Sequence, residues 1–127
     1  MATRVLLVED NEVYRSTLEL LLDGRDGIEV VGSVADGRDA AAAAERLTPD
    51  VVLMDFRLPG LDGAEATAAI RARTPRSAIL CLTAEATDAD RAAVLAAGAV
   101  GLIEKGSSID DLVRAVHDAS QRGEPIT

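Results

Sequence analysis

The chain has 127 residues and a formal net charge of −9, which indicates a single, strongly acidic domain. This charge argues against contacts of the domain itself with a nucleic-acid backbone, and one Tyr with one Phe gives no platform for stacking bases. The single cysteine, Cys81, excludes an intrachain disulfide and favours a reducing compartment. Because no apolar run reaches membrane-spanning length and no signal-peptide pattern opens the chain, we expect a cytoplasmic protein without membrane contact.

Short apolar runs alternate with helical patterns along the whole chain. The runs typical of buried strands are residues 5–8, 28–34, 51–54, 78–82 and 100–103. A helical pattern follows each run, and the residues expected to begin these helices are Asn11, Asp36, Asp62, Thr87 and Ser108. Short connections between alternating strands and helices predict a doubly wound α/β fold with one five-stranded parallel sheet and five helices.

Polar residues follow the ends of four of the predicted strands. They are Glu9 and Asp10, then Asp55, Thr83 and Lys105. Parallel strands point the same way, so these side chains gather at the carboxyl edge, and three acids converge if the first and third strands are neighbours. Carboxylates at close range repel one another, and Mg²⁺, which binds a few protein oxygens together with water, resolves that repulsion. The pattern therefore indicates a magnesium site in which Asp55 can act as a nucleophile.

Four motifs at these positions resemble those of one family. They are Val-Glu-Asp-Asn at 8–11, Leu-Met-Asp-Phe-Arg-Leu-Pro-Gly-Leu-Asp-Gly at 53–63, Leu-Thr-Ala at 82–84, and Gly-Ala-Val-Gly-Leu-Ile-Glu-Lys at 98–105. The chain resembles the receiver domain of bacterial two-component response regulators, similar to those of LuxR/NarL-type transcriptional regulators. The resemblance covers essentially the whole chain, and it implies a flavodoxin-like sheet of order 2-1-3-4-5.

The resemblance implies a role for each of these residues. Asp55 would accept a phosphoryl group from the phosphohistidine of a sensor histidine kinase, and Mg²⁺ would be held by Glu9, Asp10, Asp55 and the Arg57 carbonyl. Lys105 would neutralise a phosphoryl oxygen, and the Thr83 hydroxyl would act as the switch. Such a domain is a phosphoacceptor and not an enzyme; it switches an output, here transcription regulation through a DNA-binding domain outside this chain, and a homodimer is compatible with it.

Two positions bear on how the signal leaves the site. Leu102 stands three residues before Lys105, where the family commonly carries Tyr or Phe, so the aromatic half of the switch is missing. Arg57 and Glu85 each lie two residues beyond a site residue, and we hypothesise that they pair across the crevice and hinder the attacking water. We expect Tyr14 to contact the core and Cys81 to be a small core residue.

Three alternatives remain beside the phosphoacceptor. A degenerate receiver would act as a phosphorylation-independent interaction module, as the loss of the aromatic at Leu102 allows. A phosphohydrolase with an aspartate nucleophile typically needs a second acid where this chain has Arg57, and an FMN site is disfavoured by the acidic loop after the first strand. We expect residues 1–120 to form the receiver domain and residues 121–127 to be a tail or the start of a linker to an output domain.

Overall fold

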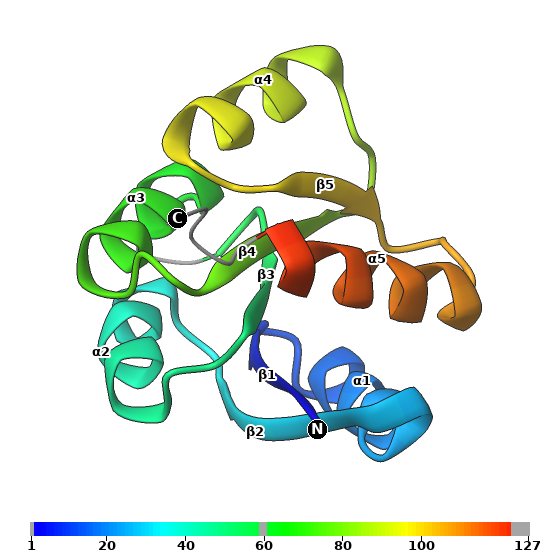
Figure 1. The fold of residues 1–127 in the computed structure, drawn as a ribbon. Helices are drawn as coiled ribbons and strands as arrows, with labels where there is room; N and C mark the ends of the chain where they lie inside the picture. Colours follow the sequence, from blue (N-terminus) through cyan, green and yellow to red (C-terminus); the bar gives the residue numbers. More distant parts are fainter. Residues whose placement is uncertain (1, 59–60, 123–127) are drawn as a thin grey trace.

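The sheet of the computed structural model is parallel and has five strands, as the sequence pattern predicts (Figure 1). The strands are β1 (Thr3–Val8), β2 (Ile28–Val34), β3 (Val51–Asp55), β4 (Ala78–Thr83) and β5 (Gly101–Glu104). Their order is β2-β1-β3-β4-β5, so β1 and β3 are neighbours at the centre. The structure describes residues 2–58 and 61–122; the turn expected at Pro59 and Gly60, and residues 123–127 of the tail, lie outside the described residues.

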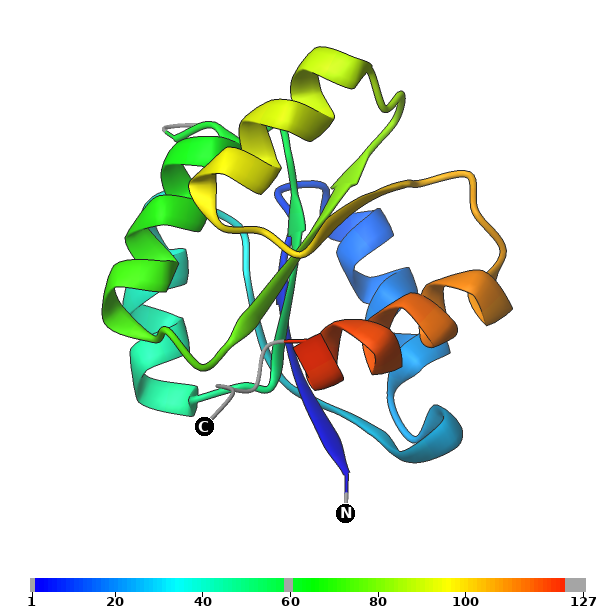
Figure 2. The ribbon, with the colours of Figure 1, turned by 45° about the horizontal axis from the view of Figure 1, so that its top comes forward.

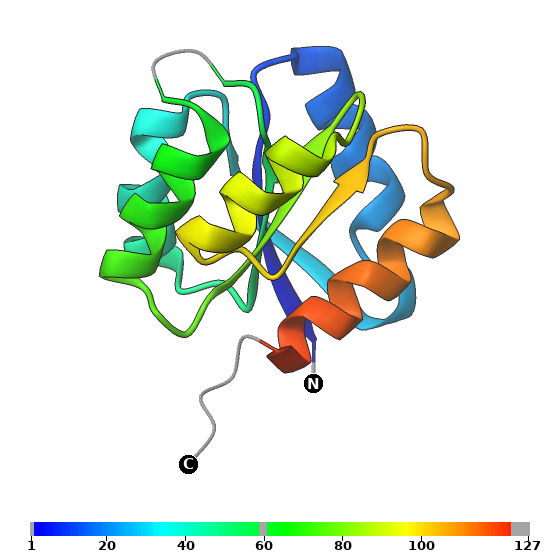
Figure 3. The same cartoon turned by 90° about the horizontal axis from the view of Figure 1, so that it is seen from above.

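Five helices and one short 3₁₀ turn complete the fold. They are α1 (Glu12–Leu22), η1 (Arg25–Gly27), α2 (Gly37–Leu47), α3 (Gly63–Arg73), α4 (Asp88–Ala97) and α5 (Ile109–Arg122). Figures 2 and 3 show α2, α3 and α4 on one side of the sheet and α1 and α5 on the other. Each side has its own apolar core. Each core is formed by the strand residues that face that side of the sheet and by the helices that cover it. No helix in the described part of the chain is long and apolar enough to span a membrane.

The predicted helix starts are confirmed by side-chain caps. Asn11, Thr87 and Ser108 each accept the backbone N–H of the residue three positions on, at 2.9, 3.0 and 3.1 Å. Asp62 caps α3 in the same manner through the Glu65 N–H, and Asp36 caps α2 by accepting the Arg38 N–H, two positions on. These oxygens bind helix-start N–H groups that would otherwise lack a partner, which is why the sequence marks where each helix begins.

The strand boundaries differ slightly from the prediction: β1 begins at Thr3 and not at Val5, and β3, β4 and β5 each end one residue later than predicted. The fifth strand begins at Gly101 and not at Val100, because Gly98 ends α4 in a left-handed conformation and regular pairing with β4 starts one residue later than expected. The first helix ends at Leu22, and Gly24, with φ of 83°, opens the turn η1, which the sequence pattern did not predict.

Gly63 fixes the segment that follows the end of β3. Its N–H donates to the Phe56 carbonyl at 2.7 Å, which brings the start of α3 against the backbone just beyond Asp55. A Cβ at position 63 would lie 2.8 Å from the Phe56 Cα and 2.9 Å from the Phe56 oxygen, so only glycine permits this approach. The glycine therefore helps to position the loop at the carboxyl edge.

Candidate functional site

Three acids meet at the carboxyl edge of the two central strands. Glu9 and Asp10 follow the last residue of β1, and Asp55 ends β3. Each offers a carboxylate oxygen, and these oxygens lie within 4.8 Å of one another. Glu9 and Asp55 are buried whereas Asp10 is exposed, so the group opens to solvent on one side. The neighbouring positions of β1 and β3 thus bring the three predicted acids together.

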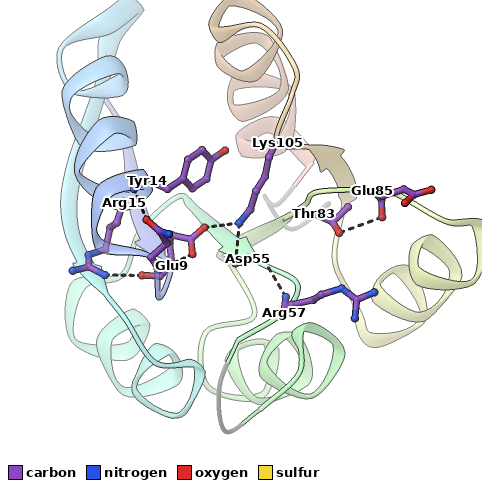
Figure 4. A network of polar contacts seen from close by, with 9 residues as sticks. Glu9, Tyr14, Arg15, Asp55, Arg57, Thr83, Glu85 and Lys105 are labelled. Carbon is purple, nitrogen blue, oxygen red and sulfur yellow. Dashed lines mark hydrogen bonds and ion pairs between the residues drawn. The ribbon is translucent and has the colours of Figure 1, made fainter.

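Lys105 supplies a positive charge to the two buried acids. Its ammonium donates to Glu9 Oε1 at 2.8 Å and to Asp55 Oδ2 at 3.0 Å (Figure 4). The same nitrogen lies 4.8 Å from the centroid of the Tyr14 ring, a cation–π distance. Loss of water opposes the charged form, but hydrogen bonds to Glu9 and Asp55 outweigh it and raise the pKa of Lys105. The ammonium therefore stays charged across the physiological range.

The backbone around Glu9 holds its carboxylate in place. The N–H of Asn11 donates to Glu9 Oε2 at 3.0 Å, and the Arg15 guanidinium donates to the Glu9 carbonyl at 2.7 Å.

Loss of water around Asp10 and its nearness to Glu9 raise the pKa of the Asp10 carboxyl. The site thus carries more negative charge on the Asp10 side than Lys105 offsets.

Thr83 ends β4, directly beside β3, as the sequence predicts. Its hydroxyl donates to the Glu85 carbonyl at 3.3 Å, within its own loop, and its carbonyl accepts the Lys105 N–H at 2.8 Å. Figure 4 shows the Thr83 hydroxyl bonded to this loop and apart from Asp55. In this state the hydroxyl must break its bond to Glu85 before it can reach a group attached to Asp55.

The pairing hypothesised for Arg57 with Glu85 is wrong. The Arg57 guanidinium pairs with Asp90, at 3.8 Å between Nη2 and Oδ2. Glu85 lies exposed in the loop before α4, and Figure 4 shows no contact between its side chain and Arg57. Asp90 belongs to the first turn of α4, and its side chain is turned inward, with 19% exposed. The Arg57 N–H donates to Asp55 Oδ1 at 3.1 Å, so its backbone does adjoin the site.

Leu102 is buried within β5, on the core face shared with α4. Its carbonyl accepts a hydrogen bond from the Arg91 guanidinium at 3.1 Å, which ties α4 to β5. The aliphatic side chain of Leu102 thus fills its place in the core, and the hydrogen bond from Arg91 to its carbonyl holds α4 against β5.

Sequence reasoning missed two contributors to this site. Tyr14 was assigned to core contact alone, and it does pack on the α1–α5 core, but its ring also faces the Lys105 ammonium. Asp90 stands three residues after the helix-start residue Thr87, and the sequence pattern links it to that cap and not to the site. Local spacing reports the cap, whereas no short-range signal reports a partner 33 positions away on another element.

Comparison with known proteins decides the family. The family model described as the response regulator receiver domain matches residues 5–117. The chain belongs to this family. The strand order and five helices are those of the flavodoxin-like receiver fold.

Relatives of this receiver domain include bacterial response regulators. It is 38% identical to the response regulator protein VraR of Staphylococcus aureus over 126 residues, 99% of this chain and 60% of VraR. A LuxR-family response regulator from Aurantimonas is 34% identical, with a TM-score of 0.90 over 96% of this chain and 87% of that one. The chain spans 60% of the length of VraR. It spans 32% of the length of another curated relative, a protein-glutamate methylesterase/protein-glutamine glutaminase from Anaeromyxobacter dehalogenans.

A third relative is described with a metal ion. The receiver domain of the sensor histidine kinase PA1611 from Pseudomonas aeruginosa is 40% identical, with a TM-score of 0.81. The match covers 95% of this chain and 99% of that one, and that structure has a magnesium ion coordinated in its active-site cleft.

Proposed function

We propose that this receiver domain accepts a phosphoryl group on Asp55 from a sensor histidine kinase. The observation that carries the proposal is the buried carboxylate of Asp55, with Lys105 bonded to one oxygen and the Arg57 N–H to the other. In the reaction an Asp55 oxygen attacks phosphorus and forms a P–O bond. The P–N bond to the kinase histidine breaks, and the imidazole leaves with the electron pair, so no oxidant or further reactant is needed.

The acidic group fits Mg²⁺. Its donors are hard carboxylate oxygens, they lie within 4.8 Å of one another, and Asp10 is open to solvent that can supply water ligands. Glu9, Asp10, Asp55 and the Arg57 carbonyl would hold the ion, which when bound supplies charge neutralisation for phosphoryl oxygens. The magnesium described for the PA1611 receiver domain supports this assignment.

Residues of the chain account for the remaining requirements. Lys105 already donates to Asp55 Oδ2, and its ammonium can move to a phosphoryl oxygen without leaving the site. Thr83 would exchange the Glu85 carbonyl for a phosphoryl oxygen, which draws the loop before α4 toward Asp55. The phosphorylated state is thereby coupled to α4 and β5, where a two-state shift would change partner contacts.

The output belongs to segments or partners beyond this domain. We infer transcription regulation through a DNA-binding domain outside this chain, on the ground of its LuxR-family relatives. In this assignment residues 1–120 form the receiver, residues 121–127 lead toward the output domain, and the protein acts in the cytoplasm, with a homodimer as one state of the switch. Phosphoryl acceptance makes the domain a signalling substrate, and we do not assign it an enzymatic turnover.

A second candidate is a phosphorylation-independent interaction module. The feature that favours it is Leu102, a buried aliphatic residue at the position where the family resemblance implies an aromatic ring. The acids, Thr83 and Lys105 are all present, however, and a module that is never phosphorylated has no need of buried carboxylates paired with an ammonium. We therefore rank the phosphoacceptor first.

The test is incubation with Mg²⁺ and acetyl phosphate, followed by intact mass measurement. We expect one labile phosphoryl increment, which is absent from Asp55→Asn and present in Asp88→Asn, a control that removes an exposed acid from α4. Omitting Mg²⁺ should slow its appearance. Absence of an increment in the wild type would overturn the phosphoacceptor and support the interaction module.

A further inference from the structure

Asp90 carries a buried carboxylate oxygen that lacks a hydrogen-bond partner. Its Oδ2 makes no hydrogen bond within the described residues, and the nearest opposite charge is the Arg57 guanidinium at 3.8 Å. That separation is beyond hydrogen bonding but within an ion pair. A buried carboxylate without a donor is costly, so Asp90 attracts the guanidinium to the side of α4.

Arg57 has a fixed backbone and a side chain that is free to turn. Its N–H is bound to Asp55 Oδ1, and residue 57 forms a bridge with Asp62, so the main chain is held at the site. The side chain is 75% exposed, and its guanidinium lies 5.7 Å from the centroid of the Phe56 ring. The guanidinium can therefore change partners by rotating while the backbone stays in place.

Phosphorylation would present a second anion to this guanidinium. A phosphoryl group on Asp55 lies two residues from Arg57 and offers oxygens that an arginine can bind in a bidentate manner. We propose that Asp90 is a positioning residue that holds Arg57 away from the phosphoryl group and so sets the lifetime of the phosphorylated state. This inference rests on the proposed phosphorylation of Asp55.

The lifetime of the phosphorylated state is set by the rate of hydrolysis, and this rate depends on where the Arg57 guanidinium lies. A water oxygen attacks phosphorus, the P–O bond to Asp55 breaks, and the Asp55 carboxylate leaves with the electron pair; orthophosphate and a proton pass to solvent. A guanidinium bound over the phosphoryl oxygens obstructs the approach of that water. With Asp90 as a competing partner Arg57 stays at α4, and hydrolysis is faster than it would otherwise be.

The same contact joins the site to α4. Asp90 links the helix to the segment after β3, and the adjacent Arg91 links it to the Leu102 carbonyl in β5. The Arg57–Asp90 pair thus connects the backbone beside Asp55 to α4 through a contact that needs no aromatic ring at Leu102.

The decisive experiment compares the wild type, Asp90→Asn, Arg57→Ala and the double variant. Each is phosphorylated with acetyl phosphate and Mg²⁺, the donor is removed, and the half-life of the phosphoryl increment is followed by intact mass. We expect Asp90→Asn to lengthen the half-life by about two- to fivefold, the range that a weak exposed ion pair allows. The gain should vanish in the Arg57→Ala background, and Asp88→Asn should behave as the wild type.

A spectroscopic measurement separates positioning from a merely structural role. In the unphosphorylated protein, the NMR resonance of the Arg57 side-chain Nε–H should shift in Asp90→Asn and stay in place in Asp88→Asn. An unchanged half-life in Asp90→Asn, or a gain that persists without Arg57, would overturn the inference while leaving the phosphoacceptor intact. No phosphoryl increment in the wild type would instead overturn the proposed function, and the inference with it.

Discussion

The Lys105 ammonium lies 3.0 Å from Asp55 Oδ2 and bridges this carboxylate to Glu9. Lys105 is the chain's only lysine, whereas arginine supplies all the other strongly basic side chains. A compact ammonium can contact two converging carboxylates and still rotate its third donor toward a new oxygen, which the planar guanidinium cannot do as readily. The bridge therefore offsets part of the negative charge of the two buried acids and keeps one donor available for the phosphoryl group that we propose on Asp55.

Replacing Lys105 with methionine should destabilise the fold. Lys105→Met leaves two buried carboxylates without their cation, and we expect the free energy of unfolding at pH 7 to fall by about 1–3 kcal/mol, less than for a fully buried pair because the lysine is partly exposed. Urea titration measures the change. Lys105→Arg retains the charge and should lose less stability, whereas a Lys105→Met protein as stable as the wild type would contradict the charge argument.

Magnesium should stabilise the folded domain through Asp10. Because partial loss of water and the neighbouring Glu9 raise the Asp10 pKa, its contribution to stability is present below the ordinary value of 3.8 and is lost as the pH rises through the folded value. An ion bound to the ionised group reverses this loss, and at about 100 times its dissociation constant it adds about 2.7 kcal/mol. Thermal unfolding with and without MgCl₂ at pH 7 measures the effect.

Two comparisons test the assignment of that effect. Asp10→Asn should be more stable than the wild type without Mg²⁺ and gain less from its addition, since the repulsion with Glu9 is gone. Lowering the pH toward 4 should shrink the gain in the wild type as Asp10 takes up a proton. An equal Mg²⁺ gain in both proteins would place the ion elsewhere.

A feature of this fold can be predicted from the sequence when the interaction that forms it is local or follows from the order of the strands. The cap at Asn11 and the apolar strand 28–34 are local patterns, and both were predictable. The convergence of Glu9 with Asp55 follows from topology, since neighbouring parallel strands end at one edge. These features depend on the backbone plan, which hydrophobic periodicity largely specifies.

The features that sequence reasoning missed depend on side-chain direction. The sequence offers Arg57 an acid in the loop before α4, Glu85, and another in the first turn of α4, Asp90, and only the inward turn of the Asp90 side chain decides between them. The turn η1 likewise depends on the positive φ of 49° at Asp26. Aspartate tolerates this conformation, but its presence in a sequence does not predict it. Rotamers and single left-handed residues leave no periodic trace.

Gly63→Ala should weaken the loop that follows Asp55. The added Cβ would lie 2.8 Å from the Phe56 Cα, a clash with backbone that no side-chain rotation relieves. We expect a loss of about 1–3 kcal/mol in unfolding free energy, the usual cost of overpacking, with a slower phosphorylation of Asp55 by acetyl phosphate. Urea titration and intact mass measure the two effects.

Gly106→Ala is the matched control for this substitution. A Cβ at Gly106 meets nothing within 4 Å, and its backbone does not adopt a positive φ, so the variant should be as stable as the wild type or slightly more stable. If Gly63→Ala were equally harmless, the contact with Phe56 would not constrain the start of α3.

Cys81 should make the domain sensitive to alkali. Burial raises the pKa of its thiol from 9.0 to about 11, so the folded chain keeps the neutral thiol while the unfolded chain ionises it. The resulting stability is complete below pH 9 and is lost as the pH rises through about 11. This difference in pKa between the unfolded and the folded chain corresponds to about 2–3 kcal/mol, which urea titration at several pH values should reveal.

Cys81→Ala isolates this contribution from the other groups that titrate in the same range. The pKa values of Tyr14 and Lys105 are also raised, so both proteins should lose stability in alkali, and the difference between them reports the thiol alone. We expect the variant to be less stable at pH 8, because removal of the buried sulfur leaves a void beside Thr67. Its free energy of unfolding should nevertheless decline less steeply between pH 9 and 11. Parallel declines would show that the Cys81 thiol ionises as readily in the folded chain as in the unfolded one, and that its burial has no electrostatic consequence.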